Sequence, residues 1–271
     1  MRPLVMGVLN VTPDSFSDGG AWADTDAAVR RGRELLAEGA DIVDVGGEST
    51  RPGAEPVGID TELARVVPTI EALVGDVAAA GARLSVDTRH AEVARAALAA
   101  GATILNDVSA SLEQVAGDAD AGWVAMHMLG EPGTMQDSPH YDDVVAEVRA
   151  FLVAAEQRGR DAGVDEIWID PGIGFGKTFE HNWALLGALD QLVATGIPVA
   201  VGTSRKGFLG AVLAEADGTD DRPGPDDRLE GSITTACWAA TMGAAMIRVH
   251  DVRATVAALD AALTAPGSGG T

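Results

Sequence analysis

The chain has 271 residues, 46% of them hydrophobic, and a formal net charge of −22 at pH 7. This charge opposes unassisted binding to nucleic acid, because such binding depends on clustered cationic side chains. The first ten residues lack a full signal-peptide core, and no stretch is apolar enough over about 20 residues to span a bilayer. We therefore expect a cytoplasmic protein with neither a nucleic-acid nor a membrane partner.

Eight short runs of mainly apolar residues predict eight strands. In chain order the expected strands are Leu4–Leu9, Ile42–Val45, Arg83–Val86, Thr103–Leu105, Trp123–Met126, Ile167–Ile169, Pro198–Val201 and Met246–Val249. Most of these runs are nearly continuous, which is typical of parallel strands that helices cover on both faces.

Amphipathic or alanine-rich segments between these runs predict helices. They include Thr25–Glu38, Asp60–Val77, Ala91–Ala99, Asp142–Asp161 and Leu229–Met242. Thr25, Asp60 and Asp142 are typical helix-starting residues, and a glycine follows several of the predicted ends. The stretch from Ala214 to Arg228 is rich in Asp, Gly and Pro, which indicates an exposed loop.

Strand and helix alternating eight times predict a single (β/α)8 TIM barrel over residues 1–265, with a flexible tail at 266–271. A barrel of roughly 250 residues fits this length. An open, doubly wound sheet is the structural alternative. The only cysteine, Cys237, has no partner for a disulfide, and we expect a buried core thiol in an apolar helix.

Polar or glycine-rich groups follow every predicted strand. They are Asn10, Gly46-Gly47-Glu48, Asp87, Asn106-Asp107, His127, Asp170, Ser204-Arg205-Lys206 and Arg248-Val249-His250. Each taken singly has a simple structural explanation, such as a helix cap. In a barrel, however, all strand ends meet at one rim, where catalytic groups gather. The coincidence at eight ends therefore predicts a binding site.

The residue types at this rim suit a flat, donor-rich heterocycle with an anionic tail. Asp87 and Asp170 can accept ring N–H groups, and Asn106 can both donate and accept. Lys206 can donate to a ring carbonyl, and Arg248 can stack on a ring face. Arg51, Arg248 and His250 can hold phosphate oxygens.

Two other patterns resemble known sites without matching them. The run from Gly172 to Thr178 imitates a phosphate-binding P-loop, but that motif requires glycine where Pro171 stands. A set made of His127, Asp87, Asp107 and Glu48 offers zinc-binding atoms, yet it contains no Cys and no second His. We expect neither a P-loop nor that zinc site.

Two long motifs are similar to signatures of the dihydropteroate synthase family. They span residues 6–20 (MGVLNVTPDSFSDGG) and 44–53 (DVGGESTRPG). Shorter matches follow in order at residues 85–88, 106–109, 126–128, 170–175, 202–206 and 248–251. The resemblance covers nearly the whole chain.

The resemblance implies a transferase of folate biosynthesis. Such an enzyme condenses 6-hydroxymethyl-7,8-dihydropterin pyrophosphate with p-aminobenzoate, giving 7,8-dihydropteroate and pyrophosphate. It implies catalytic roles for Asp87, Lys206 and Arg51. The substrate-binding residues that it implies are Asn106, Met126, Asp170, Phe175, Gly202, Arg248, His250, Thr50, Pro52, Phe16 and Ser17.

The resemblance also implies a cofactor, moving loops and a partner. Asn10 would bind Mg²⁺ together with the pyrophosphate, and the loops at 12–20 and 49–53 would close over the site. The family is usually homodimeric and is inhibited by sulfonamides that mimic p-aminobenzoate. One departure stands out: Gly207 occupies a position where many members have a serine that helps to hold the p-aminobenzoate carboxylate.

Two alternative functions remain open from the residues. A corrinoid-linked methyltetrahydrofolate methyltransferase would share the barrel and the pterin pocket, but it has no pyrophosphate to hold. A non-catalytic pterin-binding paralogue would keep the pocket without the reaction.

Overall fold

A computed structural model describes residues 2–12, 21–49 and 56–264 of the chain. Eight parallel strands form one sheet in the order β6-β5-β4-β3-β2-β1-β8-β7. The strands are β1 (Leu4–Asn10), β2 (Ile42–Gly46), β3 (Arg83–Asp87), β4 (Ile104–Asp107), β5 (Gly122–Met126), β6 (Ile167–Asp170), β7 (Ala200–Val201) and β8 (Met246–Val249). One isolated bridge, between Ile169 of β6 and Val199 just before β7, joins the two ends of this order and closes the barrel. The predicted TIM barrel is thus confirmed, and the open sheet is excluded.

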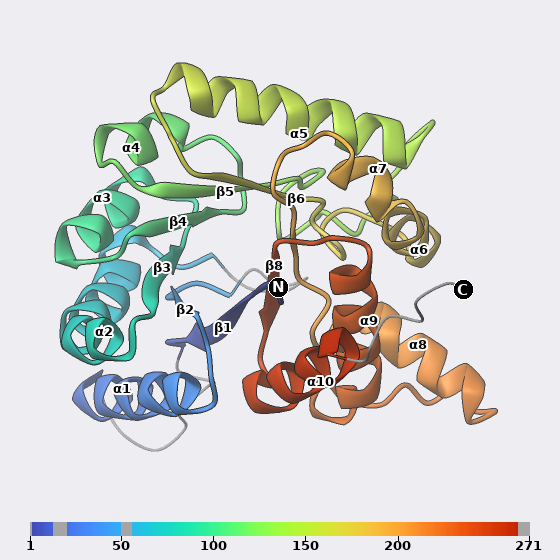
Figure 1. The fold of residues 1–271 in the computed structure, drawn as a ribbon, viewed down its shortest axis with the longest axis horizontal. Helices are drawn as coiled ribbons and strands as arrows, with labels where there is room; N and C mark the ends of the chain where they lie inside the picture. The colour runs from blue at the N-terminus through green and yellow to red at the C-terminus, as the bar shows by residue number, and fades with distance from the viewer. Residues whose placement is uncertain (1, 13–20, 50–55, 265–271) are drawn as a thin grey trace.

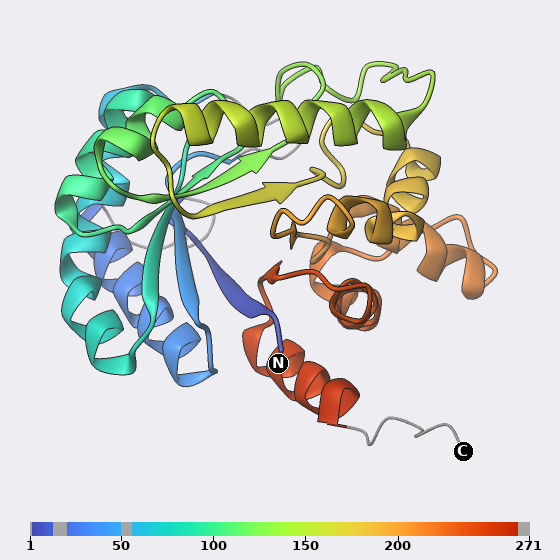
Figure 2. The same ribbon diagram turned by 45° about the horizontal axis from the view of Figure 1, so that its top comes forward.

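The helices lie outside the strands, as Figures 1 and 2 show. They are α1 (Ala21–Ala37), α2 (Ile59–Ala80), α3 (Ala91–Ala100), α4 (Glu113–Asp118), α5 (Val144–Asp161), α6 (Phe179–Gly187), α7 (Leu189–Val193), α8 (Gly207–Ala216), α9 (Leu229–Thr241) and α10 (Val252–Thr264), with a 3-10 turn η2 (Pro225–Asp227) before α9. None of the described helices is both long and apolar enough to cross a membrane.

Local signals explain several helix ends and correct three predicted starts. The side chain of Asp143, not Asp142, caps α5 by accepting the backbone N–H groups of residues 145 and 146. Gly81 ends α2 in the left-handed conformation, at φ 67°, which glycine adopts without a Cβ clash. Helix α1 starts at Ala21, ahead of the expected Thr25, and Gly58 rather than Asp60 precedes α2.

Side chains alternate between the two faces of the barrel wall. One buried cluster draws only on strand residues and therefore fills the barrel interior: Met6, Ile42, Ile104, Val124, Trp168, Ala200 and Met246. The intervening strand residues pack outward with the helices in the main core. Because side chains repeat their direction every two residues, the next inward positions are Val8, Asp44, Asn106, Met126, Asp170, Gly202 and Arg248. A polar layer thus lies directly above an apolar floor.

Two local expectations need adjustment. Cys237 lies on α9 and is only partly buried, because its side chain packs at the edge of the core rather than inside it. The stretch from Ala214 to Arg228 is largely exposed, as predicted, but its first three residues belong to α8 and η2 forms near its end. The predicted tail at 266–271 lies outside the described residues.

Candidate active site

Two adjoining cavities open at the C-terminal ends of the strands. The smaller, about 50 Å³, is the inner slot; it is lined by Asp87, Asn106, Val108, Met126, Asp170, Phe175, Gly202, Ser204, Lys206, Arg248 and His250. The larger, about 630 Å³, is the outer cavity, and its lining includes Asn10, Glu48, Gly207, Phe208 and Arg228. Lys206, Arg248 and His250 line both cavities.

The structure brings together the predicted site residues that it describes. Every one of the predicted pterin and phosphate residues beyond position 56 lines the inner slot, and Asn10 lines the outer cavity. Phe16, Ser17, Thr50, Arg51 and Pro52 lie outside the described residues, so their placement stays a prediction.

A charged network crosses the floor of the site. The Nε of Arg248 lies 2.7 Å from Asp44 Oδ2, and its Nη2 lies 2.5 Å from Asp87 Oδ2. Asn106 donates from Nδ2 to the same Asp44 oxygen at 3.0 Å. Burial alone would lower the pKa of Arg248, but the Asp44 and Asp87 carboxylates raise it above its ordinary value. The guanidinium is therefore a fixed positive charge.

Asp87 combines a buried position with an unused acceptor. Its Oδ1 has no hydrogen-bond partner among the described residues. Burial raises the pKa of Asp87 to about 7, while Arg248 partly opposes the shift and Asp44 adds to it. An unsatisfied buried carboxylate oxygen is costly, so a ligand that donates an N–H group here would relieve that cost.

Asp170 and Lys206 both line the inner slot, where the charge of each affects the pKa of the other. Asp170 accepts the backbone N–H of Gly172 at 2.7 Å, and burial raises its pKa although Lys206 opposes the shift. Lys206 donates to the carbonyl of Ile173, and its Nζ lies 4.8 Å from the centroid of the Phe175 ring. Desolvation lowers the pKa of Lys206 to about 8, with Asp170 acting in the opposite direction.

The glycine-rich loop after β6 builds one wall of the slot and does not form a P-loop. Gly172 has φ 63°, and a Cβ there would lie 1.8 Å from the carbonyl oxygen of His127, so only glycine fits. Lys177 points into the protein, where Nζ lies 2.9 Å from Phe175 O and 3.0 Å from His127 Nδ1. Burial lowers the pKa of Lys177 to about 7 and that of His127 to about 3. Lys177 therefore holds the loop.

The zinc set considered from sequence does not assemble. His127 contacts Lys177, as above. The carboxylate of Asp107 accepts hydrogen bonds from the backbone of Ser109, Ser111 and Leu112 and from the Trp123 indole, so it is fully used in shaping a turn. Its strand position points out of the barrel, opposite to Asn106.

Residues at the end of β8 and the start of α8 complete the rim. Ser204 Oγ lies 3.0 Å from His250 Nδ1 and accepts the backbone N–H of His250 at 3.1 Å. Gly207 is the first residue of α8, and a Cβ added there would meet nothing within 4 Å. The first N–H groups of a helix lack intrahelical acceptors, so this end offers donors to an anion in the outer cavity.

Asp44 is a site residue that the sequence pattern did not predict. It sits in the middle of an apolar run and is fully buried, with its side chain on the inner face of β2. A charged residue at an inward strand position was the available signal, because buried carboxylates require partners.

Comparison with known proteins agrees with this geometry. A family model described as pterin binding enzyme matches residues 6–250. A dihydropteroate synthase of Mycobacterium leprae is 52% identical over 263 residues, which cover 94% of this chain and 90% of that protein. A Xanthomonas albilineans dihydropteroate synthase solved with 4-aminobenzoic acid superposes with a TM-score of 0.87 at 47% identity, covering 98% of this chain and 94% of the other.

A second Xanthomonas albilineans structure, with a different bound molecule, is also similar to this chain. This dihydropteroate synthase in complex with 7,8-dihydropteroate gives a TM-score of 0.83 at 43% identity, over 98% of this chain and 95% of the other. Similarity at this level and coverage extends over the barrel, the inner slot and the rim. The chain belongs to the pterin-binding enzymes and, among them, to the dihydropteroate synthase family.

Proposed function

We propose that this transferase joins 6-hydroxymethyl-7,8-dihydropterin pyrophosphate to p-aminobenzoate, releasing pyrophosphate and 7,8-dihydropteroate. The observation that carries the proposal is the inner slot, where Asp87, Asp170, Asn106 and Lys206 converge. Two carboxylates, an amide and an ammonium group match the donor-rich edge and the carbonyl of a pterin ring. The relatives described above act in the same pathway step.

The pterin ring would take over hydrogen bonds that the protein now makes with itself. Asp87 Oδ1 is available as an acceptor, and Asp170 has acceptor capacity beyond its bond to Gly172. Lys206 would exchange the Ile173 carbonyl for the ring carbonyl. Met126, Phe175 and Gly202 would shape the slot, and the missing side chain of Gly202 leaves room beside Arg248.

The pyrophosphate would lie where the two cavities meet. Arg248 and His250 line both of them, so each can reach an anion in the outer cavity while the ring occupies the inner slot. Arg51, outside the described residues, is the third expected phosphate partner.

The residues at the end of β1 fit an oxygen-bound Mg²⁺. Asn10 lines the outer cavity, and both Asn10 Oδ1 and Asp87 Oδ2 lie beside Gly46, which has no side chain to fill the space. Mg²⁺ prefers hard oxygen ligands and is commonly shared between one or two protein groups and substrate phosphates. When bound, the ion would neutralise charge on the leaving pyrophosphate, and Asn10 would orient it.

The p-aminobenzoate carboxylate would bind at the start of α8. The outer cavity is lined there by Gly207 and Phe208, whose N–H groups lie in the first helical turn. Phe16, Ser17, Thr50 and Pro52 remain the proposed frame for its ring.

In the proposed reaction the bond between the pterin methylene carbon and the pyrophosphate oxygen breaks first. The electron pair leaves with pyrophosphate, and the resulting cation lies near the Asp87 carboxylate. The arylamine nitrogen then forms the new C–N bond and loses one proton. Closure of the loops at 12–20 and 49–53 would exclude water, which would otherwise compete as the nucleophile.

The decisive experiment mixes the protein with both substrates and measures pyrophosphate release. We expect release that depends on both substrates and equals the dihydropteroate formed. A protein that binds the pterin without releasing pyrophosphate would instead be the non-catalytic paralogue. The methyltransferase alternative is disfavoured by the dihydropteroate synthase relatives, which match nearly the whole chain.

We also propose a homodimer and a cytoplasmic location. Trp183 on α6 and Trp238 on α9 are both partly exposed. The Trp238 indole donates a hydrogen bond to the Leu186 carbonyl of α6, so both tryptophans lie at α6. Exposed tryptophans at one helix suit a subunit interface, where aromatic residues are enriched. Light scattering would show a mass twice that of the chain, and fractionation of expressing cells would test the location.

A further inference from the structure

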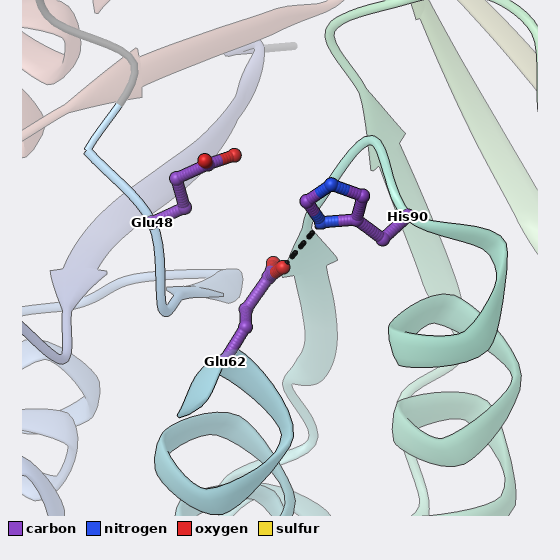
Figure 3. Close-up of side chains that lie close together, drawn as sticks. All are labelled: Glu48, Glu62 and His90. Atoms are coloured by element: carbon purple, nitrogen blue, oxygen red, sulfur yellow. Dashed lines mark hydrogen bonds and ion pairs between the residues drawn. The ribbon is translucent and has the colours of Figure 1, made fainter. Parts of the chain in front are cut away.

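Three side chains from separate segments meet near the family motif at residues 44–53. Glu48 follows β2, Glu62 lies in the first turns of α2, and His90 directly precedes α3, as Figure 3 shows. Each offers one ligand atom, and these atoms all lie within 4.8 Å of one another. None of the three has a role in the proposed reaction, although Glu48 also lines the outer cavity.

Glu62 is the unusual member of this group. Its side chain is fully buried, and its Oε1 has no hydrogen-bond partner among the described residues. Its other oxygen lies 2.7 Å from Nδ1 of His90. One hydrogen bond does not satisfy a buried carboxylate, which normally requires a cation or several donors.

The cations nearby compensate this group only in part. Arg89 donates to both oxygens of Glu48, at 3.1 Å from Nε to Oε2 and 3.4 Å from Nη2 to Oε1, and the backbone N–H of Val57 donates to Oε1 at 3.0 Å. Arg89 is shared with Glu131, whose carboxylate lies 2.8 Å from Nη1. Within the part of the chain that the structure describes, no ion pair joins Arg89 to Glu62, and His90 is the charged or polar side chain shown beside the Glu62 carboxylate.

We propose that Glu48, Glu62 and His90 bind one divalent transition-metal ion, for which Zn²⁺ is the fitting class. Two carboxylate oxygens and one imidazole nitrogen form a three-ligand set that leaves a fourth position for water. The 2.7 Å between His90 Nδ1 and Glu62 Oε2 is a hydrogen-bond distance, which metal bonds of about 2.0 to 2.2 Å would widen to roughly 3.3 Å. The metal would replace the proton between these two atoms, and the neutral imidazole would carry its one ring proton on Nε2.

The donor set separates this site from the Mg²⁺ expected at Asn10. Mg²⁺ favours all-oxygen, near-octahedral surroundings, whereas imidazole nitrogen suits Zn²⁺ and its neighbours in the transition series. Bound metal would tie the residue before the loop at 49–53 to α2 and to the start of α3.

The test uses the whole chain, stripped with chelator, without pterin or p-aminobenzoate. Zn²⁺ is titrated calorimetrically, and Co²⁺ is added separately to record its visible absorption. The test variant is His90→Gln, which keeps a donor beside Glu62 and changes a partly exposed residue. The matched control is His140→Gln, because His140 also lies beside a carboxylate, Asp142 at 3.6 Å, but is largely exposed.

We expect one tight Zn²⁺ per chain in the parent and in His140→Gln, with a Co²⁺ spectrum. His90→Gln should weaken this site by about 100-fold or more, since losing even an outer-shell partner costs about 10- to 100-fold. Zn²⁺ should raise the Tm of the parent but not of His90→Gln. Only weak, non-stoichiometric binding by the parent, or equal affinity in His90→Gln, would overturn the site. Because no substrate is present, these outcomes do not depend on the proposed reaction.

Discussion

Asp44 and Arg248 form an ion pair across the barrel interior, with 2.7 Å between Oδ2 and Nε. Their strands β2 and β8 both flank β1, so the side chains meet above the apolar floor. Asp44 is fully buried and also accepts from Asn106. The pair therefore sets the position of two side chains that line the inner slot.

Replacing Asp44 with Asn should impair both activity and stability. The amide keeps the shape but removes the charge that orients Arg248, so we expect kcat/KM to fall at least about tenfold and stability by about 1 to 3 kcal/mol. Steady-state kinetics and urea unfolding would measure both quantities. The matched control is Asp41→Asn, which breaks the ion pair with Arg2 at the opposite end of β2. That partly exposed pair contributes roughly 0 to 1 kcal/mol and should leave kcat/KM unchanged. Parent-like kinetics in Asp44→Asn would exclude the positioning role.

The pH dependence of kcat/KM should form a narrow bell. Burial raises the pKa of Asp87 to about 7, and the carboxylate must be ionised, so activity should fall as the pH drops below that value. Desolvation lowers the pKa of Lys206 to about 8, and the ammonium must keep its proton, so activity should also fall above pH 8. Lys206→Arg should move the basic limb upward, because guanidinium stays charged. A flat profile from pH 5 to 10 would contradict both assignments.

The strand ends were predictable from sequence because parallel strands place them at one rim. Asp87, Asn106, Asp170 and Lys206 followed from that rule alone, and the apolar runs located the barrel. Asp44 was missed because only residues after each run were considered, although the two-residue period of a strand points it inward. The contact between Glu62 and His90 joins segments 28 residues apart, and no local pattern reports it.

Gly207→Ser should strengthen p-aminobenzoate binding. A Cβ at this position meets nothing within 4 Å, so the serine fits without strain and its hydroxyl can reach the carboxylate at the start of α8. We expect the KM for p-aminobenzoate to fall several-fold, as one added hydrogen bond contributes about 0.5 to 1.5 kcal/mol. Gly75→Ser is the matched control, because Gly75 on α2 has equally open space and lies outside both cavities. An unchanged KM would mean that the backbone donors already satisfy the carboxylate.

Catalysis should require Mg²⁺, whereas binding of a pterin without pyrophosphate should not. Asn10 is a neutral ligand, which suits a metal already bridged by phosphates rather than one bound by the protein alone. Removing Mg²⁺ with excess chelator should abolish turnover and leave calorimetric pterin affinity unchanged. Asn10→Ala should raise the Mg²⁺ concentration needed for half-maximal rate. Full turnover in chelator would remove the metal from the reaction.

Asp87→Asn should separate chemistry from binding. If the pterin methylene becomes cationic, the Asp87 carboxylate interacts more strongly with the transition state than with the neutral ground state, and only such differential contacts raise the rate. Asn keeps the side-chain shape and removes the charge. By analogy with the loss of one preorganised electrostatic partner, the chemical step should slow by roughly 10² to 10³.

Pterin affinity should also fall in this variant, so KM alone does not decide the question. The deciding measurement is single-turnover pyrophosphate release at saturating pterin, which isolates the chemical step. Asp44→Asn serves as the comparison, because it disturbs Arg248 while the Asp87 carboxylate stays in place. A slow release in Asp87→Asn and a faster one in Asp44→Asn would assign the cation to Asp87. Release at the parent rate once Asp87→Asn is saturated would show that Asp87 only positions the ring.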